Sequence, residues 1–407
     1  MSAEIRKLLV MNAITSVVTV YIGIFVNLYI WQENQRIADV SLYNMAMFVS
    51  WGAAFAAAAK LLTRFSIRLP LCLSALCGGA AFFYLMTSHL DNRTLWIVLL
   101  GLPVGAMFGL AQAAQNLGVA LQGRGSEFAP YFAAVHIIVQ VVSIAVPIAS
   151  AKVIDGFGYG GSFALMLAFL ALMLVVSARM PRIRLRKPED PAEARRFGQF
   201  GARLAFGRPG ARWIVLSLMA AGVFMQFQNL FALLFTFSVT QNKLLIALLN
   251  VAYTLSSLLG LWLYRRFRSG EMRWLWLGNG LLAAGFLIAL LQEPAALIVS
   301  NVLTTIGMFY FSTVWNAQQF RYIEFAGAAS QASFLVWREC ILIATRCALL
   351  AMTMSLTRLQ GVGFVTIVGI TIACMLVIPL VQSKAMRALQ GSYPVQASPE
   401  APSPVGS

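Results

Sequence analysis

The residues most able to do chemistry in this sequence lie together in one apolar segment. The run 335–346, LVWRECILIATR, contains Arg338, Glu339 and Arg346, and Glu339 is the one acidic residue of fourteen that lies well inside such a segment. A guanidinium in apolar surroundings suits an anionic group, because it offers paired donors to a carboxylate or a phosphate. An interior ion pair or a packing anchor is the alternative interpretation of these charges.

Uncharged polar side chains recur at helical spacing in other apolar segments. His136, Gln140, Ser143 and Pro147 are four, three and four residues apart, which places them on one helix face. A histidine can exchange protons near neutral pH, although a hydrogen-bonded structural role is the alternative. Polar residues of this kind either line a cavity or join neighbouring helices. The others are Asn12, Ser16, Thr19, Asn27, Gln112, Gln115, Gln226, Asn229 and Asn316.

Motifs of enzymes and metal sites are missing from the sequence. It contains no phosphate-binding loop, no metal-ligand spacing and no nucleophile–base pattern. The sequence therefore predicts no enzyme activity, no metal and no cofactor. The cysteines form no CxxC pair and are interpreted as small packing residues. They are Cys72, Cys77, Cys340, Cys347 and Cys374.

Membrane-spanning helices are the elements that must position these side chains. The chain is 60% hydrophobic and 11% charged, whereas soluble domains carry about 25% charged residues. A helix needs about 20 apolar residues to cross the hydrocarbon core, and it satisfies its own backbone hydrogen bonds there. We therefore predict an all-α membrane protein with twelve spans. They are 8–30, 40–60, 69–87, 95–115, 131–151, 162–178, 213–235, 244–264, 274–291, 295–316, 335–356 and 362–382.

The basic residues indicate how the chain is oriented in the membrane. Most of the 30 lysines and arginines fall at the N-terminus, in alternate loops and near the C-terminus. This asymmetry predicts that both termini are cytoplasmic. It also explains the net charge of +16 without a nucleic-acid partner, which we do not expect.

A polar stretch in the middle divides the chain into two halves. Residues 179–212 contain ten basic residues and four prolines, and the halves on either side share short patterns such as LYNMA at 42–46 and LLNVA at 248–252. Duplicated six-helix bundles are a transporter architecture. The predicted domains are a six-helix bundle at 1–180, a basic linker at 181–212, a second bundle at 213–388 and a disordered tail at 389–407.

The layout and one loop resemble the major facilitator superfamily over about residues 8–385. The loop at 59–68, AKLLTRFSIR, is similar to the superfamily's loop motif of glycine, Asp-Arg, glycine and a closing basic residue. Arg64 and Arg68 match the motif, whereas Thr63 replaces its aspartate and neither glycine is kept. The resemblance implies a major-facilitator-like fold in which the first, fourth, seventh and tenth helices surround a substrate cavity.

The resemblance also implies a gate and a direction of transport. It brings the basic loop, with Lys60, Arg64 and Arg68, near the cytoplasmic end of the eleventh helix, so we expect a latch with Glu339. The Gly-Pro signature of antiporters in the fifth span is met only at Pro147, and this favours export over uptake.

These observations predict a monomeric multi-pass transporter in a plasma membrane, the inner membrane of a bacterium. It would move a small metabolite or a drug-like molecule by alternating access, with an anionic substrate and proton coupling as hypotheses. An uncoupled facilitator or an uptake carrier is the alternative. A non-transporting membrane partner and a lipid flippase are less favoured.

Overall fold

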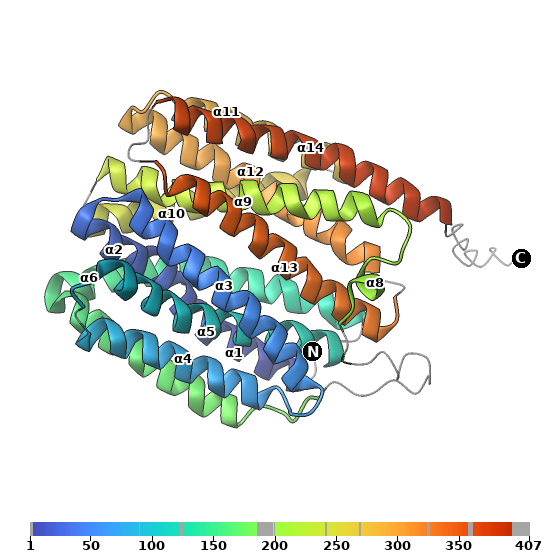
Figure 1. The fold of residues 1–407 in the computed structure, drawn as a ribbon, viewed down its shortest axis with the longest axis horizontal. Coiled ribbons are helices and arrows are strands. Elements are labelled where there is room, and N and C mark those ends of the chain that lie inside the picture. Colours follow the sequence, from blue (N-terminus) through green and yellow to red (C-terminus); the bar gives the residue numbers. More distant parts are fainter. Residues whose placement is uncertain are drawn as a thin grey trace, which may run out of the picture.

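Every regular element in the described part of the chain is a helix (Figure 1). The computed structural model describes residues 3–88, 90–122, 125–184, 198, 200–240, 242–267, 270–323, 326–356 and 361–392. Residues 393–407 of the predicted tail and residues 185–197 and 199 of the predicted linker lie outside these residues.

The first half contains six membrane-type spans. A π-helical turn joins the first two helices into one continuous span, and α6 reverses direction at Gly158, where φ is 68° and ψ is −177°. The helices are α1 (Ala3–Tyr21), η1 (Ile22–Val26), α2 (Asn27–Asn34), α3 (Ile37–Leu62), α4 (Arg68–Thr87), α5 (Arg93–Gln122) and α6 (Gly125–Ala178).

The second half contains six further spans after a single helical turn. Its helices are α8 (Ala202–Ala205), α9 (Ala211–Val239), α10 (Lys243–Arg266), α11 (Glu271–Ala289), α12 (Pro294–Ile323), α13 (Ala328–Thr353) and α14 (Val362–Ser392).

The structure confirms the twelve predicted spans. Ten helical stretches in the described residues are long and apolar enough to cross a membrane, and one of them, Ile138–Ala178, contains the reversal at Gly158 and supplies two spans. The charged helix α13 is not among the ten, but it is 26 residues long and packs within the bundle. The fold is therefore an all-α membrane architecture of two six-helix bundles.

Glycines bring α5 into backbone contact with α3 in the first half. Gly101, Gly105 and Gly109 recur every fourth residue, so they share one face of α5. A Cβ atom at any of them would overlap the carbonyl oxygen of a residue on α3, and these residues also recur every fourth position: Tyr43, Met47 and Trp51. Small residues at such interfaces allow close packing where the hydrophobic effect cannot drive association.

The second half uses its glycines on a different pair of helices. Gly278 on α11 and Gly307 on α12 face each other, because a Cβ atom on either would lie within 3 Å of the other's carbonyl oxygen. The close backbone contact therefore joins α11 to α12.

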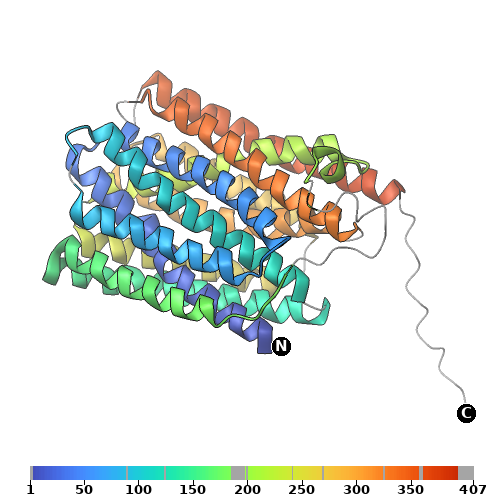
Figure 2. The same cartoon turned by 60° about the horizontal axis from the view of Figure 1, so that its bottom comes forward.

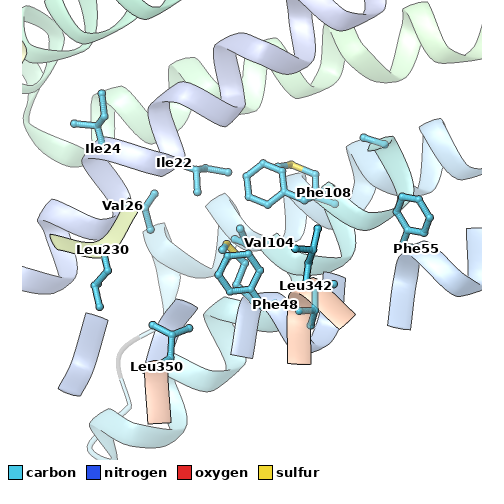
Figure 3. Packing of buried hydrophobic residues seen from close by; sticks show 14 of the residues in the cluster. Ile22, Ile24, Val26, Phe48, Phe55, Val104, Phe108, Leu230, Leu342 and Leu350 are labelled. Atoms are coloured by element: carbon cyan, nitrogen blue, oxygen red, sulfur yellow. The ribbon is translucent and has the colours of Figure 1, made fainter. Parts of the chain in front are cut away.

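The halves pack together mainly through α3 with α13 and through α6 with α10. Hydrogen bonds and ring contacts between α3 and α13 join Ser41 with Thr353, Met45 with Cys347, and Phe48 with Arg346. The start of α3 and the end of α13, where Ser41 and Thr353 meet, lie away from the start of α1 and the end of α14 (Figures 1 and 2). Figure 3 shows core residues of both halves in one cluster, among them Phe48, Val104, Leu230 and Leu342.

Candidate functional site

A buried charged group links α13 to α12. Arg338 donates a hydrogen bond to Oδ1 of Asn316 at 2.6 Å and forms an ion pair with Glu339 at 3.2 Å. Its guanidinium carbon also lies 5.2 Å from the ring centre of Trp315. Side chains adjacent in a helix normally diverge, but the length of Arg338 allows it to reach back to its neighbour. Glu339 is only 6% exposed.

Arg346 lies two helical turns further along α13 and is only 9% exposed. Its guanidinium carbon is 5.1 Å from the ring centre of Phe48 on α3, so the side chain lies at the contact between the halves. Among the described residues it has no hydrogen-bond partner, and its Nε is fully buried. The carboxylate of Glu339 attracts it electrostatically without forming an ion pair.

The charges of this group do not cancel. Arg338 and Arg346 each carry one positive charge, and within the described part of the chain Glu339 is the one carboxylate that compensates them both. A buried charge is costly unless it is paired and hydrogen-bonded. Arg346 therefore has an unmet requirement for an acceptor, and an anion that enters between the halves can supply it.

The ring of Phe48, which contacts the guanidinium of Arg346, belongs to a series of ring contacts between α3 and α5. Phe48 stacks with Trp51 at 5.8 Å between ring centres, and Trp51 contacts Phe108 of α5 at 5.3 Å. The indole Nε1 of Trp51 is buried and has no hydrogen-bond partner among the described residues. The site thus combines the apolar ring of Phe48 with the unused Nε donor of Arg346, a combination that suits an amphipathic ligand carrying an acceptor.

Predicted polar residues of the first half form a neutral group between α1 and α5. Asn12 donates to Gln115 at 3.0 Å, and Gln115 donates to Thr15 at 3.1 Å. Ser16 lies within 3.5 Å of the Asn12 side chain. These bonds join the first and fourth spans and leave Asn12 and Ser16 half-buried.

Asn27 belongs to a separate polar contact near the π-helical turn. Its side chain donates to the carbonyl oxygen of Gly23 at 3.0 Å and accepts a hydrogen bond from Asn44 of α3 at the same distance. The wider turn leaves carbonyl oxygens without their regular helical partners, and Asn27 satisfies one of them.

The remaining cavity candidates are not brought into one cluster. Gln140 on α6 accepts a hydrogen bond from Ser257 on α10 across the two halves. Thr19 and Asn229 are exposed and Gln112 is half-buried, whereas Gln226 is buried with an unpaired Oε1. The side chain of His136 lies outside the described residues.

The predicted latch is not formed in this structure. Glu339 pairs with Arg338, whereas Arg68 donates to the carbonyl oxygen of Met180, and Lys60 and Arg64 are exposed. Arg338 is adjacent to Glu339 on the same helix, and its guanidinium already pairs with the carboxylate. A gating role for these residues stays a prediction.

Sequence reasoning missed several buried polar residues that the structure connects. Asn301 on α12 donates to Thr236 on α9 and to the hydroxyl of Tyr253 on α10, and Thr304 on α12 accepts a hydrogen bond from the predicted Gln228. The only available signal was the presence of polar residues in apolar spans. Their partners lie 48 to 76 residues away along the chain.

This arrangement of helices is similar to that of solved structures of transporters. A POT family transporter in complex with 5-aminolevulinic acid superposes with a TM-score of 0.71 at 12% identity, covering 94% of this chain and 96% of that one. The POT family transporter PepTSo gives 0.72 at 11% identity over 97% and 99%. The nucleoside transporter NupG gives 0.64 at 14% identity over 94% and 99%.

The chain therefore has the fold of the major facilitator transporters, as its sequence predicted. No protein-family model matches the sequence, and no curated protein matches it. At 11 to 14% identity, the similarity to these structures establishes the fold and leaves the substrate to be argued from the site.

Proposed function

We propose that this protein is a secondary transporter that moves a small amphipathic molecule with an anionic group. The observation that supports this proposal is Arg346, which is buried at the contact between the halves and has no hydrogen-bond partner among the described residues. An anion there would accept hydrogen bonds from the guanidinium of Arg346. The ring of Phe48 would contact the apolar part of the same ligand.

The structural neighbours support a small polar substrate. One of them is a complex with 5-aminolevulinic acid, which carries a carboxylate, and another is a peptide transporter. NupG is a nucleoside transporter, and a nucleoside carries no negative charge. The excess positive charge on α13 favours the carboxylate-bearing class for this chain.

The first test compares ligands with and without a negatively charged group, and a dipeptide and its C-terminal amide form the matched pair. Purified protein is heated with a dipeptide, its C-terminal amide, 5-aminolevulinic acid, inorganic phosphate and uridine, and its melting temperature is recorded. We expect the dipeptide acid to raise the melting temperature and the amide to leave it unchanged, because binding to the folded state stabilises it. Stabilisation by uridine alone would contradict the anionic proposal.

The second part of the test assigns the effect to Arg346. Arg346→Lys keeps the charge but loses the paired donors, so we expect uptake into liposomes of the stabilising ligand to fall several-fold. Arg346→Ala should abolish flux while membrane-inserted protein stays at the wild-type amount. If Arg346→Ala lowers abundance and melting temperature first, the residue is structural, and normal flux in this variant would reject both roles.

Orientation and direction form part of the proposal. With the basic residues in the cytoplasm, the end that carries the start of α1 and the end of α14 is cytoplasmic, and the contacts between α3 and α13 close the opposite side. Reporter fusions at residue 195 and at the C-terminus should then indicate cytoplasm, and fusions near Asn92 and Gln292 the other side. A non-cytoplasmic residue 195 would reject this orientation.

We favour export, with protons as the coupling ion. Flux measured in both directions, with and without a pH gradient, distinguishes proton-coupled export from uptake or from uncoupled facilitation.

A further inference from the structure

A basic groove lies on the surface of the first half, away from the charged group of α13. It has a volume of about 420 Å³ and runs between the start of α1 and the end of α6. Three cationic and three apolar side chains line it, with no carboxylate among them. They are Arg6, Lys7, Val10, Val176, Arg179 and Met180.

The cationic side chains of the groove are available to a ligand. Arg6, Lys7 and Arg179 are all exposed. Within the described residues, none of these side chains takes part in an ion pair or a hydrogen bond. Three like charges around one groove repel each other, so an anion placed between them is favoured.

The apolar side chains continue the groove along the helices. Val10 lies one turn deeper than Arg6 on α1 and is 53% exposed, and Val176 lies before Arg179 on α6. Because the first and sixth spans enter the membrane at these points, the cations lie at headgroup level and the valines at the level of the acyl chains. A charged rim above an exposed apolar strip matches a molecule that is anionic at one end and apolar at the other.

We propose that this groove binds an anionic phospholipid, with its phosphate between Arg6, Lys7 and Arg179 and an acyl chain along Val10 and Val176. Juxtamembrane cations are attracted to anionic lipids, and the groove gathers three of them at one place. A solvated basic surface would attract the same lipids without retaining any single one.

The test measures how much lipid the intact protein retains. Protein is reconstituted with equal phosphatidylglycerol and phosphatidylcholine, and bound lipids are counted by native mass spectrometry. We expect the wild type to retain one phosphatidylglycerol in preference to phosphatidylcholine. The combined change Arg6→Gln, Lys7→Gln and Arg179→Gln should weaken retention by about 5-fold for each cation and on the order of 100-fold for all three.

Two further variants keep the test specific. The control removes three exposed arginines that lie in the second half, through Arg203→Gln, Arg266→Gln and Arg273→Gln, and should retain the lipid. Val10→Trp should displace it without changing the net charge, because the indole fills the groove.

The contrary outcomes are distinct. Equal loss in both triple variants would show that diffuse surface charge attracts the lipid, and this would overturn the proposal. Unchanged retention in the groove variant would overturn it as well. Displacement of the lipid by glycerol phosphate, which has the headgroup without acyl chains, would indicate a free phosphate site instead.

Discussion

Helices α3 and α13 face each other across the two halves, but they differ in charge and in how they are held. Between Asp39 and Lys60, α3 has no charged residue, and its backbone rests against the glycines of α5. Helix α13 has three charged residues within nine positions, and two of them are bound by α12 or by each other. Close backbone contact leaves no room for long side chains. The buried charges therefore lie on α13, opposite the neutral aromatic surface of α3.

The largest effect is expected at the carboxylate that compensates two guanidiniums. Glu339→Gln leaves Arg338 and Arg346 without a counter-charge, and removing one partner of a buried pair costs about 3–5 kcal/mol. We expect a large fall in melting temperature and in the amount of membrane-inserted protein. Adding Arg338→Gln should recover part of the loss, since one unpaired charge is then removed.

An exposed ion pair provides the control for this prediction. Glu271 forms two hydrogen bonds with Arg321, and both side chains are solvent-accessible at 40% and 52%. Glu271→Gln should therefore cost less than about 1 kcal/mol. If both glutamate variants are equally stable, water screens the charged group on α13. The proposed difference between the buried charges of α13 and an exposed ion pair would then be contradicted.

The second prediction concerns the contact between the glycines of α5 and the backbone of the neutral helix α3. Gly105→Ala places a methyl group into the carbonyl of Met47 and should destabilise the protein by about 1–3 kcal/mol through overpacking. Gly79→Ala is the control, because no atom lies within 4 Å of its added methyl group. It should be neutral or stabilising by up to about 1 kcal/mol, as alanine favours helices. Gly105→Ala should therefore lower the melting temperature, whereas Gly79→Ala should leave it unchanged or raise it, and equal shifts would contradict the assigned contact.

The smallest effect is expected in the polar group between α1 and α5. Gln115→Leu removes the bonds to Asn12 and Thr15, and we expect a loss of about 1 kcal/mol. Gln112 lies one turn earlier on the same helix, is half-buried and has no hydrogen-bond partner among the described residues. The melting temperature of the Gln112→Leu variant should therefore equal that of the wild type. Equal flux defects in both would place the two residues in the substrate path, whereas a stability defect in Gln115→Leu alone would assign it to helix packing.

Most of the architecture followed from local properties of the chain. Apolar segments of the length of a bilayer predicted all twelve spans, because a helix in lipid must satisfy its backbone within itself. The charged segment was also visible, since Arg338, Glu339 and Arg346 stand out in an apolar run. The glycines at every fourth residue of α5 were visible in the sequence, but the sequence did not indicate which helix they contact.

Only the tertiary structure decided which side chains meet. The sequence assigned Glu339 to a distant basic loop, whereas the folded chain pairs it with Arg338 and places Phe48, from the other half of the chain, beside Arg346. Gly105 and Gly307 occupy similar sequence patterns but contact different helices. The physical reason is that the bilayer determines where each helix forms from the length and apolarity of that one segment. Partners between helices are fixed by side-chain shape and hydrogen bonds that act only after the helices have assembled.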